Sequence, residues 1–173
     1  MLYLGRYASS EANLARVLRD RVRRHVERHG GDAAQARSWI PPLVERLARA
    51  GLVDDRSSGE GLIRRLRRRG ASERQIRAKL AEKGIRRELA EELLAPDEDS
   101  DPAAIELAGA CRTVRRRGFG PYHRDPERRR ERRERELASL ARAGYALGAA
   151  ARALDAPDRE QIEDWILAGS PLD

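Results

Sequence analysis

The chain has 173 residues, of which 38% are charged, well above the about 25% that is typical of globular domains. With 40% hydrophobic and 4% aromatic residues, we expect thin helices that each bury one stripe rather than a single thick core. The single cysteine excludes an internal disulfide or cysteine-rich zinc site. No apolar stretch approaches the about 18 residues that a membrane span needs, so we expect no membrane contact.

The net charge is +7, and Lys79 and Lys83 are the only lysines among 36 basic residues. Arginine is the better partner for phosphate and carboxylate groups, because its planar fork binds both oxygens. GC-rich codons are an alternative reason for arginine over lysine, but they do not explain the net charge or its clustering. The N-terminus lacks the pattern of a secretory signal, so we expect a cytoplasmic protein.

Helix-forming residues dominate, and no run of alternating β-branched residues occurs, so the sequence predicts an all-α fold without a sheet. A first helix is expected over about residues 10–29, with Leu14, Leu18 and Val22 on one stripe. A second begins near Pro41 and Pro42, which are tolerated only close to a helix start. Further stripes follow in chain order: Leu62, Ile63 and Leu66; Ile76 and Leu80; Leu89, Leu93 and Leu94; Leu107, Cys111 and Val114; Leu137, Leu140 and Ala141; Tyr145, Ala149 and Ala153; Ile162, Trp165 and Ile166.

The helix ends are also legible in the sequence. Glycine closes helices in the left-handed C′ conformation, and we expect it to do so at Gly30, Gly51, Gly70, Gly84, Gly118 and Gly144. Helix starts are predicted at two capping boxes, Ser57 with Glu60 and Ser72 with Gln75. Adjacent aspartate and proline residues predict further starts at Asp101-Pro102, Asp125-Pro126 and Pro157-Asp158.

The pattern Leu-Ala-x-x-Gly-apolar occurs three times, starting at Leu47, Leu80 and Leu140. The last two copies lie 60 residues apart, and each follows a basic helix and precedes a short one, which indicates a repeated three-helix unit. Glycine-capped Ala-Leu helices that merely look alike are the alternative. We therefore predict tandem three-helix repeats, similar to helix-turn-helix units, that form an elongated curved array with a short C-terminal helix. The predicted boundaries are 1–53, 54–95, an acidic linker at 96–101, 102–155, and a C-terminal helix and tail at 156–173.

Four parts of the chain carry a resemblance to a known family: Arg6–Leu18; Leu47–Asp55; Arg69–Ile85; and Arg115–Tyr122 followed by Leu140–Tyr145. In this order they resemble the successive units of the RecX family, over about residues 5–155. The resemblance implies a tandem three-helix fold without catalytic residues and a protein that modulates the RecA recombinase. RecX-like proteins are thought to lie in the helical groove of the RecA filament, and a curved array would suit that position.

Two arginine clusters are the candidate contact residues for RecA or DNA: Arg64, Arg65, Arg67, Arg68 and Arg69, and then Arg112, Arg115, Arg116 and Arg117. No acid interrupts either run, which favours contact with phosphate or with an acidic protein surface over a merely solvated face. In a third run, Arg128–Arg135, glutamates lie three or four residues from several arginines, so we expect internal pairing there.

Other chemistry-bearing residues have plainer explanations. Asp54 and Asp55 are expected to cap a helix and join two units, rather than to act as an acid or metal pair. His25 and His29 could share a metal, but no third ligand except Asp32 is evident nearby and zinc needs three or four. We therefore expect a solvated or half-buried pair. We expect Cys111 in the core, and Gly120, Pro121 and Tyr122 in a turn. Gly51, Gly84 and Gly144 complete the predicted structural motifs.

The leading hypothesis is therefore a monomeric, non-enzymatic regulator of homologous recombination and DNA repair. It would bind the RecA filament and contact DNA either directly or through that filament. This binding would inhibit the ATPase activity, the growth and the strand exchange of the filament. The alternative is a helical protein that binds nucleic acid without sequence preference and has no recombinase partner. We expect neither a cofactor nor a metal, because no nucleophile–base pair, phosphate loop or ligand cluster is evident.

Overall fold

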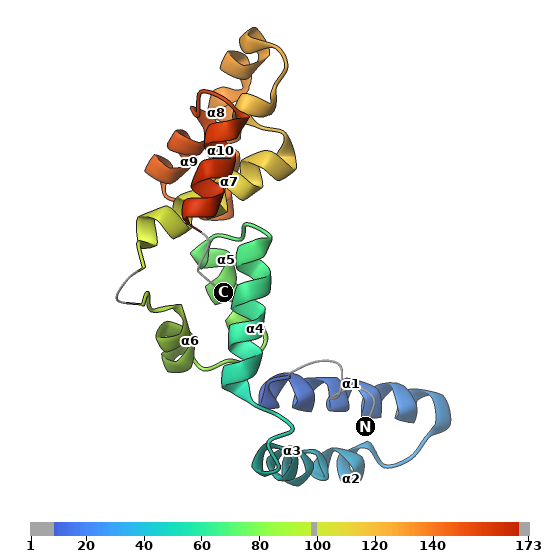
Figure 1. Cartoon of the computed structure of the whole chain (residues 1–173). Helices are drawn as coiled ribbons and strands as arrows, with labels where there is room; N and C mark the ends of the chain where they lie inside the picture. The colour runs from blue at the N-terminus through green and yellow to red at the C-terminus, as the bar shows by residue number, and fades with distance from the viewer. Residues whose placement is uncertain (1–8, 98–99, 170–173) are drawn as a thin grey trace. The chain divides into compact units, whose positions relative to one another are not determined.

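The computed structural model describes residues 9–97 and 100–169, and all regular structure in these residues is helical, which confirms the predicted all-α class (Figure 1). Residues 1–8, 98–99 and 170–173 belong to the predicted first unit, linker and tail, and lie outside the described residues. The helices are α1 (Glu11–His29), α2 (Ala33–Ser38), α3 (Ile40–Arg49), α4 (Asp55–Arg68), α5 (Glu73–Glu82), α6 (Arg87–Leu94), α7 (Pro102–Arg117), the 3₁₀ turn η1 (Gly120–Tyr122), α8 (Pro126–Ala143), α9 (Leu147–Leu154) and α10 (Arg159–Ala168).

The chain forms two compact units, and α4 and α5 contribute to both. Compact unit 1 contains residues up to Leu62 together with Lys79–Leu93, and compact unit 2 contains Ile63–Ala78 and the chain from Leu94 onward. Each unit is described by itself below.

In compact unit 1, α1 packs against α2 and α3. Leu14, Ile40, Val44 and Val53 are buried together, and the predicted stripe of α1 continues along them with half-buried side chains. Pro41 and Pro42 lie in the first turn of α3, where backbone N–H groups have no partner within the helix.

In compact unit 2, α7 is the central helix and contacts α9 and α10, while α8 also packs on α9. Its predicted stripe, Leu107, Cys111 and Val114, is buried against Leu140 and Ile162. Trp165 is partly buried against this core, so α10 belongs to it.

The aspartate caps are confirmed at three helix starts. The side chains of Asp101, Asp125 and Asp158 accept hydrogen bonds from backbone N–H groups at the starts of α7, α8 and α10. The capping box of α5 is also confirmed, because the Ser72 and Gln75 side chains each accept from the other residue's N–H at 3.3 Å.

The predicted capping box at Ser57 and Glu60 is wrong by three residues. Helix α4 already begins at Asp55. The Asp54 carboxylate accepts from the Arg56 N–H at 2.9 Å and from the Ser57 hydroxyl at 2.6 Å. An aspartate oxygen is as good an N-cap as a serine hydroxyl, so Asp54 caps the helix three residues before the predicted position.

Glycine closes five of the helices in the same way. The N–H of the residue after Gly51, Gly70, Gly84, Gly118 and Gly144 donates to the carbonyl five residues earlier, at 3.0 to 3.2 Å. This is the Schellman arrangement that the sequence pattern predicts.

Two of these glycine ends also receive an equivalent contact from elsewhere in the chain. The hydroxyl of Ser10, the N-cap of α1, donates to the Lys83 carbonyl just before Gly84. The hydroxyl of Ser72, at the start of α5, donates to the Ala143 carbonyl just before Gly144, at 2.5 Å. We call this pair of contacts the serine–carbonyl junctions.

Candidate interaction surface

The first arginine cluster lies at the end of α4 and just beyond it. Leu62 and Ile63 point into the interior, whereas Arg65, Arg68 and Arg69 are exposed, as the helical spacing requires. None of these three side chains forms an ion pair with a described residue. Arg64 is exposed as well, and Arg67 is half-buried. Arg65, Arg68 and Arg69 therefore present positive charge that no ion pair within the described part of the chain neutralises.

The second cluster lies on α7, and its side chains are engaged within compact unit 2. Arg115 forms an ion pair with Glu163 of α10. Arg116 donates to the Arg69 carbonyl, and Arg117 donates to the Ser139 hydroxyl at 2.7 Å. These arginines thus attach α7 to its neighbours.

Arg112 is the least exposed arginine of this second cluster. It is half-buried and donates to the Ile166 carbonyl at 3.4 Å. Burial lowers the pKa of its guanidinium, and the nearby charge of Arg115 lowers that pKa further.

A hydrogen-bonded network brings the two clusters together. The Gly70 carbonyl, directly after Arg69, accepts from the Thr113 hydroxyl at 2.8 Å and also from the Tyr145 hydroxyl. The hydroxyl oxygens of Thr113 and Tyr145 lie 2.9 Å apart. The Tyr145 hydroxyl also lies within hydrogen-bond distance of the Gly109 carbonyl, at 3.1 Å. Gly70, Thr113 and Tyr145 are all buried, which makes the network costly to break.

The third run, in α8, is partly used to hold α9. Arg133 binds both carboxylate oxygens of Asp155 at 2.7 and 2.6 Å, and Arg129 donates to the Leu154 and Ala156 carbonyls. The sequence predicted pairing with glutamates of the same helix. Instead, these two side chains lie at the C-terminal end of α9, where cations complement the helix dipole.

The aspartate pair acts at two helix starts. Asp54 caps α4, and hydrogen bonds, first of all from the Ser57 hydroxyl, lower the pKa of its carboxyl. Asp55 accepts from the N–H of Glu11, the first residue of α1, at 2.9 Å. Both carboxylates are thus engaged by groups that need a hydrogen-bond acceptor rather than by each other.

The turn at Gly120, Pro121 and Tyr122 forms η1, and a buried carboxylate holds it. Glu136 accepts from the Gly120 N–H at 3.0 Å and lies 2.6 Å from Nε2 of His123. The Tyr122 hydroxyl donates to Glu163 at 3.1 Å. The sequence reading missed Glu136, because one glutamate in an arginine-rich helix gives no signal of burial.

The remaining candidates are placed as follows. Cys111 is fully buried. His25 and His29 are exposed, with ring centres 4.9 Å apart. The described residues hold no group of three or more His, Cys, Asp or Glu side chains suited to a metal ion. Among the same residues, no helix is long and apolar enough to cross a membrane.

The fold and the arginine clusters define a basic, all-helical protein with an arginine-rich surface. The chain is 37% identical over 153 residues to the regulatory protein RecX of Myxococcus xanthus (strain DK1622), and the match covers 88% of this chain and 80% of that relative. The chain belongs to the RecX family. No family model matches the chain. No solved structure matches it either.

Proposed function

We propose that this chain regulates the RecA recombinase by binding the RecA filament on DNA. The binding would inhibit ATP hydrolysis, filament growth and strand exchange, without catalysis by the chain itself. The observation that carries this proposal is the 37% identity, over 88% of the chain, to a protein named regulatory protein RecX. The family resemblance points to RecA as the partner. The net charge of +7 suits binding to a filament that contains negatively charged DNA.

The first arginine cluster, at the end of α4 (the α4 cluster), is the proposed contact surface, and the second cluster is called the α7 cluster. Arg65, Arg68 and Arg69 are exposed and make no ion pair within the described residues, so binding would not first require a salt bridge to be broken. The α7 cluster is also a candidate, but its members already hold neighbouring segments. Because Arg116 donates to the Arg69 carbonyl, we assign α7 the additional task of fixing the end of α4.

The proposed organisation is a tandem array of three-helix repeats: α1–α3, α4–α6 and α7–α9. The serine–carbonyl junctions support it. In each, an N-cap serine contacts the glycine end of a helix about 70 residues later, with sequence separations of 73 and 71. The two glycine ends close α5 and α8, the second helices of successive repeats, and a contact that recurs at such positions is typical of repeats that pack on their neighbours.

The decisive experiment measures the DNA-dependent ATP hydrolysis of RecA while this protein is titrated in at substoichiometric amounts. Excess free single-stranded DNA is then added as a competitor. We expect inhibition that persists with the competitor present, because the target is the filament. Inhibition that the added DNA abolishes would instead indicate simple DNA binding, and an unchanged ATPase would remove RecA as the target.

A charge-matched pair of variants tests the contact surface. Replacing Arg65, Arg68 and Arg69 by Ala is expected to weaken filament binding about tenfold or more, because each removes an exposed cation. The control replaces Arg128, Arg130 and Arg132 of α8, which are also exposed and unpaired within the described residues. Circular dichroism should show equal helix content in both. Equal loss of binding in both variants would show that only net charge matters.

A further inference from the structure

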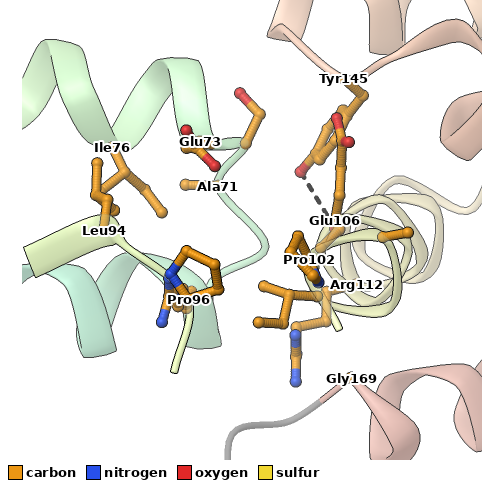
Figure 2. A pocket seen from close by; sticks show the side chains of 15 residues that line it. Ala71, Glu73, Ile76, Leu94, Pro96, Pro102, Glu106, Arg112, Tyr145 and Gly169 are labelled. Atoms are coloured by element: carbon orange, nitrogen blue, oxygen red, sulfur yellow. Dashed lines mark hydrogen bonds between the residues drawn. The ribbon is translucent and has the colours of Figure 1, made fainter. Parts of the chain in front are cut away.

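Compact unit 2 contains a pocket of about 300 Å³ beside the turn between α4 and α5 (Figure 2). Ile76 and Leu94 line one side, and Pro102, Glu106 and Arg112 line the other. Ile76 and Leu94 are buried, whereas Pro96, Pro102 and Ala103 are exposed, so the pocket is open to solvent. Its volume is at the lower end of the range of about 300 to 1,000 Å³ for ligand sites, which suits one or two side chains.

The acidic side chains in the pocket already have partners within the chain. Glu73 accepts from Nε and Nη2 of Arg77, at 3.0 and 2.7 Å. Glu106 accepts from the Ala146 N–H at 2.9 Å. Arg77 does not line the pocket, so the charge of Glu73 is offset from outside it. Glu106 is held by a neutral N–H and keeps its negative charge on the wall opposite Ile76 and Leu94.

The basic side chains of the pocket are arranged differently. Arg67 is half-buried in the wall and forms no ion pair with a described residue. Arg112 donates to the Ile166 carbonyl and is held against α10. The exposed Arg68 and Arg69 follow Arg67 directly in the chain. The wall at Arg67 therefore combines apolar side chains with positive charge, which complements a carboxylate next to an apolar side chain.

We propose that this pocket binds an acidic peptide segment, taking up a bulky apolar side chain while a neighbouring carboxylate meets Arg67. A single apolar anchor with a charged rim is a common way for a small pocket to contribute binding energy. The proposal goes beyond the regulation of RecA, because it does not depend on which protein supplies the peptide.

A peptide fits the pocket better than a nucleic-acid base does. The wall is mainly aliphatic, formed by Ile76, Leu94, Ile105 and proline rings. Tyr145 is the one aromatic residue in the lining; it is buried, and its hydroxyl is engaged by Thr113 and by the Gly109 carbonyl. Bases bound without sequence preference stack on accessible aromatic rings, and this pocket presents none among its described residues.

The test uses the full chain with labelled isoleucine methyl groups and the synthetic peptide GDEDLFDEDG. We expect the methyl signals of Ile76 and Ile105 to shift on titration, while those of Ile40 and Ile85, outside the pocket, stay in place. Two control peptides carry Ser-Ser in place of Leu-Phe, or Asn and Gln in place of the acids. We expect both to bind at least about tenfold more weakly.

Two variants, each with a matched control, locate the binding. Ala103→Trp places a large ring at the exposed edge of the pocket, and Ala138→Trp adds the same ring at an exposed position of α8. Arg67→Glu reverses the charge of the wall, and Arg132→Glu makes the same change at an exposed position of α8 outside the lining. We expect the first variant of each pair to lose peptide binding about tenfold or more and its control to retain it.

Several results would overturn the proposal. The first is that the peptide does not bind. The second is that the peptide without Leu-Phe binds equally well, and the third is that the two variants of each pair have equal effects. A ten-nucleotide oligothymidine strand that shifts the same two methyl groups more strongly would reassign the pocket to nucleic acid. Since no recombinase is present, these results are independent of the ATPase experiment.

Discussion

Cys111 illustrates how strongly a buried position changes the chemistry of one residue. Its side chain is fully buried in the core of compact unit 2. Burial raises the pKa of the thiol to about 12, and the opposing effect of nearby Arg152 and Arg112 is smaller. Because the thiolate is the reactive form, this cysteine should be inert in the folded protein.

We therefore expect Cys111 to react with a thiol reagent such as DTNB at about pH 8 only after unfolding. The absorbance of the released thiol should stay at baseline for the native protein and rise to one equivalent in concentrated guanidinium chloride. Rapid labelling of the native protein would contradict the burial of this side chain.

The arginines show which residue-level properties the sequence can predict. Helical spacing correctly separates exposed Arg65 and Arg68 from buried Leu62, because side-chain direction follows from a local period. The partners of the α7 cluster were not predictable in this way. Arg115 meets Glu163 at a sequence separation of 48, and Arg117 meets Ser139 at 22, so these contacts depend on how the helices pack.

At the scale of the elements, the sequence predicted helix ends better than helix number. Aspartate caps and C′ glycines act through local hydrogen bonds, so Asp101 and Gly118 could be identified without any tertiary information. Helix α2 was missed, because its six residues carry no apolar stripe. Its signal was Asp32, whose carboxylate accepts from the Ala34 and Gln35 N–H groups at 2.8 and 3.0 Å.

The attachment of α8 to the end of α9 makes a pH-dependent prediction. The hydrogen bonds from Arg133 lower the pKa of Asp155 below its ordinary value of 3.8. A carboxyl whose pKa is lower in the folded state stabilises the fold at pH values above 3.8 and loses this contribution as the pH falls further. Since both side chains are almost half exposed, we expect an effect of only about 0.2 to 1 kcal/mol.

Urea unfolding of Arg133→Ala at neutral pH and near pH 3 measures this contribution. The variant should be less stable than the parent at neutral pH, and the difference should shrink at the acidic pH as Asp155 becomes protonated. Arg128→Ala removes an exposed α8 arginine without an ion pair in the described residues, and should show no such pH dependence. A constant difference for Arg133→Ala would contradict the assignment.

At the scale of the whole molecule, we expect the two serine–carbonyl junctions to be equally sensitive to substitution, because in both a glycine lies against the helix that follows the capping serine. Gly84 and Gly144 have φ angles of +73° and +95°, which side chains rarely adopt. An added Cβ at Gly84 would collide with Ala12, two residues after Ser10, and one at Gly144 would lie 2.9 Å from Arg74 Cβ, two residues after Ser72. The same relative position is thus crowded in both places.

We expect Gly84→Ala and Gly144→Ala each to lower the free energy of unfolding by more than about 1 kcal/mol. Gly148→Ala is the control, because its φ is ordinary and no atom lies within 4 Å of its added Cβ. That change should leave stability unchanged or slightly raised. Thermal unfolding followed by circular dichroism compares the three, and a neutral Gly84→Ala or Gly144→Ala would argue against the junction described here.

The serine–carbonyl junctions also bear on how such a chain can change its length in evolution. Each junction needs only a capping serine on one unit and a glycine-terminated helix on a later one. A duplicated unit would carry both halves of this connection, and could join its neighbours without inventing a new interface. On the proposed repeat organisation, whole units could therefore be gained or lost by internal duplication and deletion without a new kind of contact at each junction.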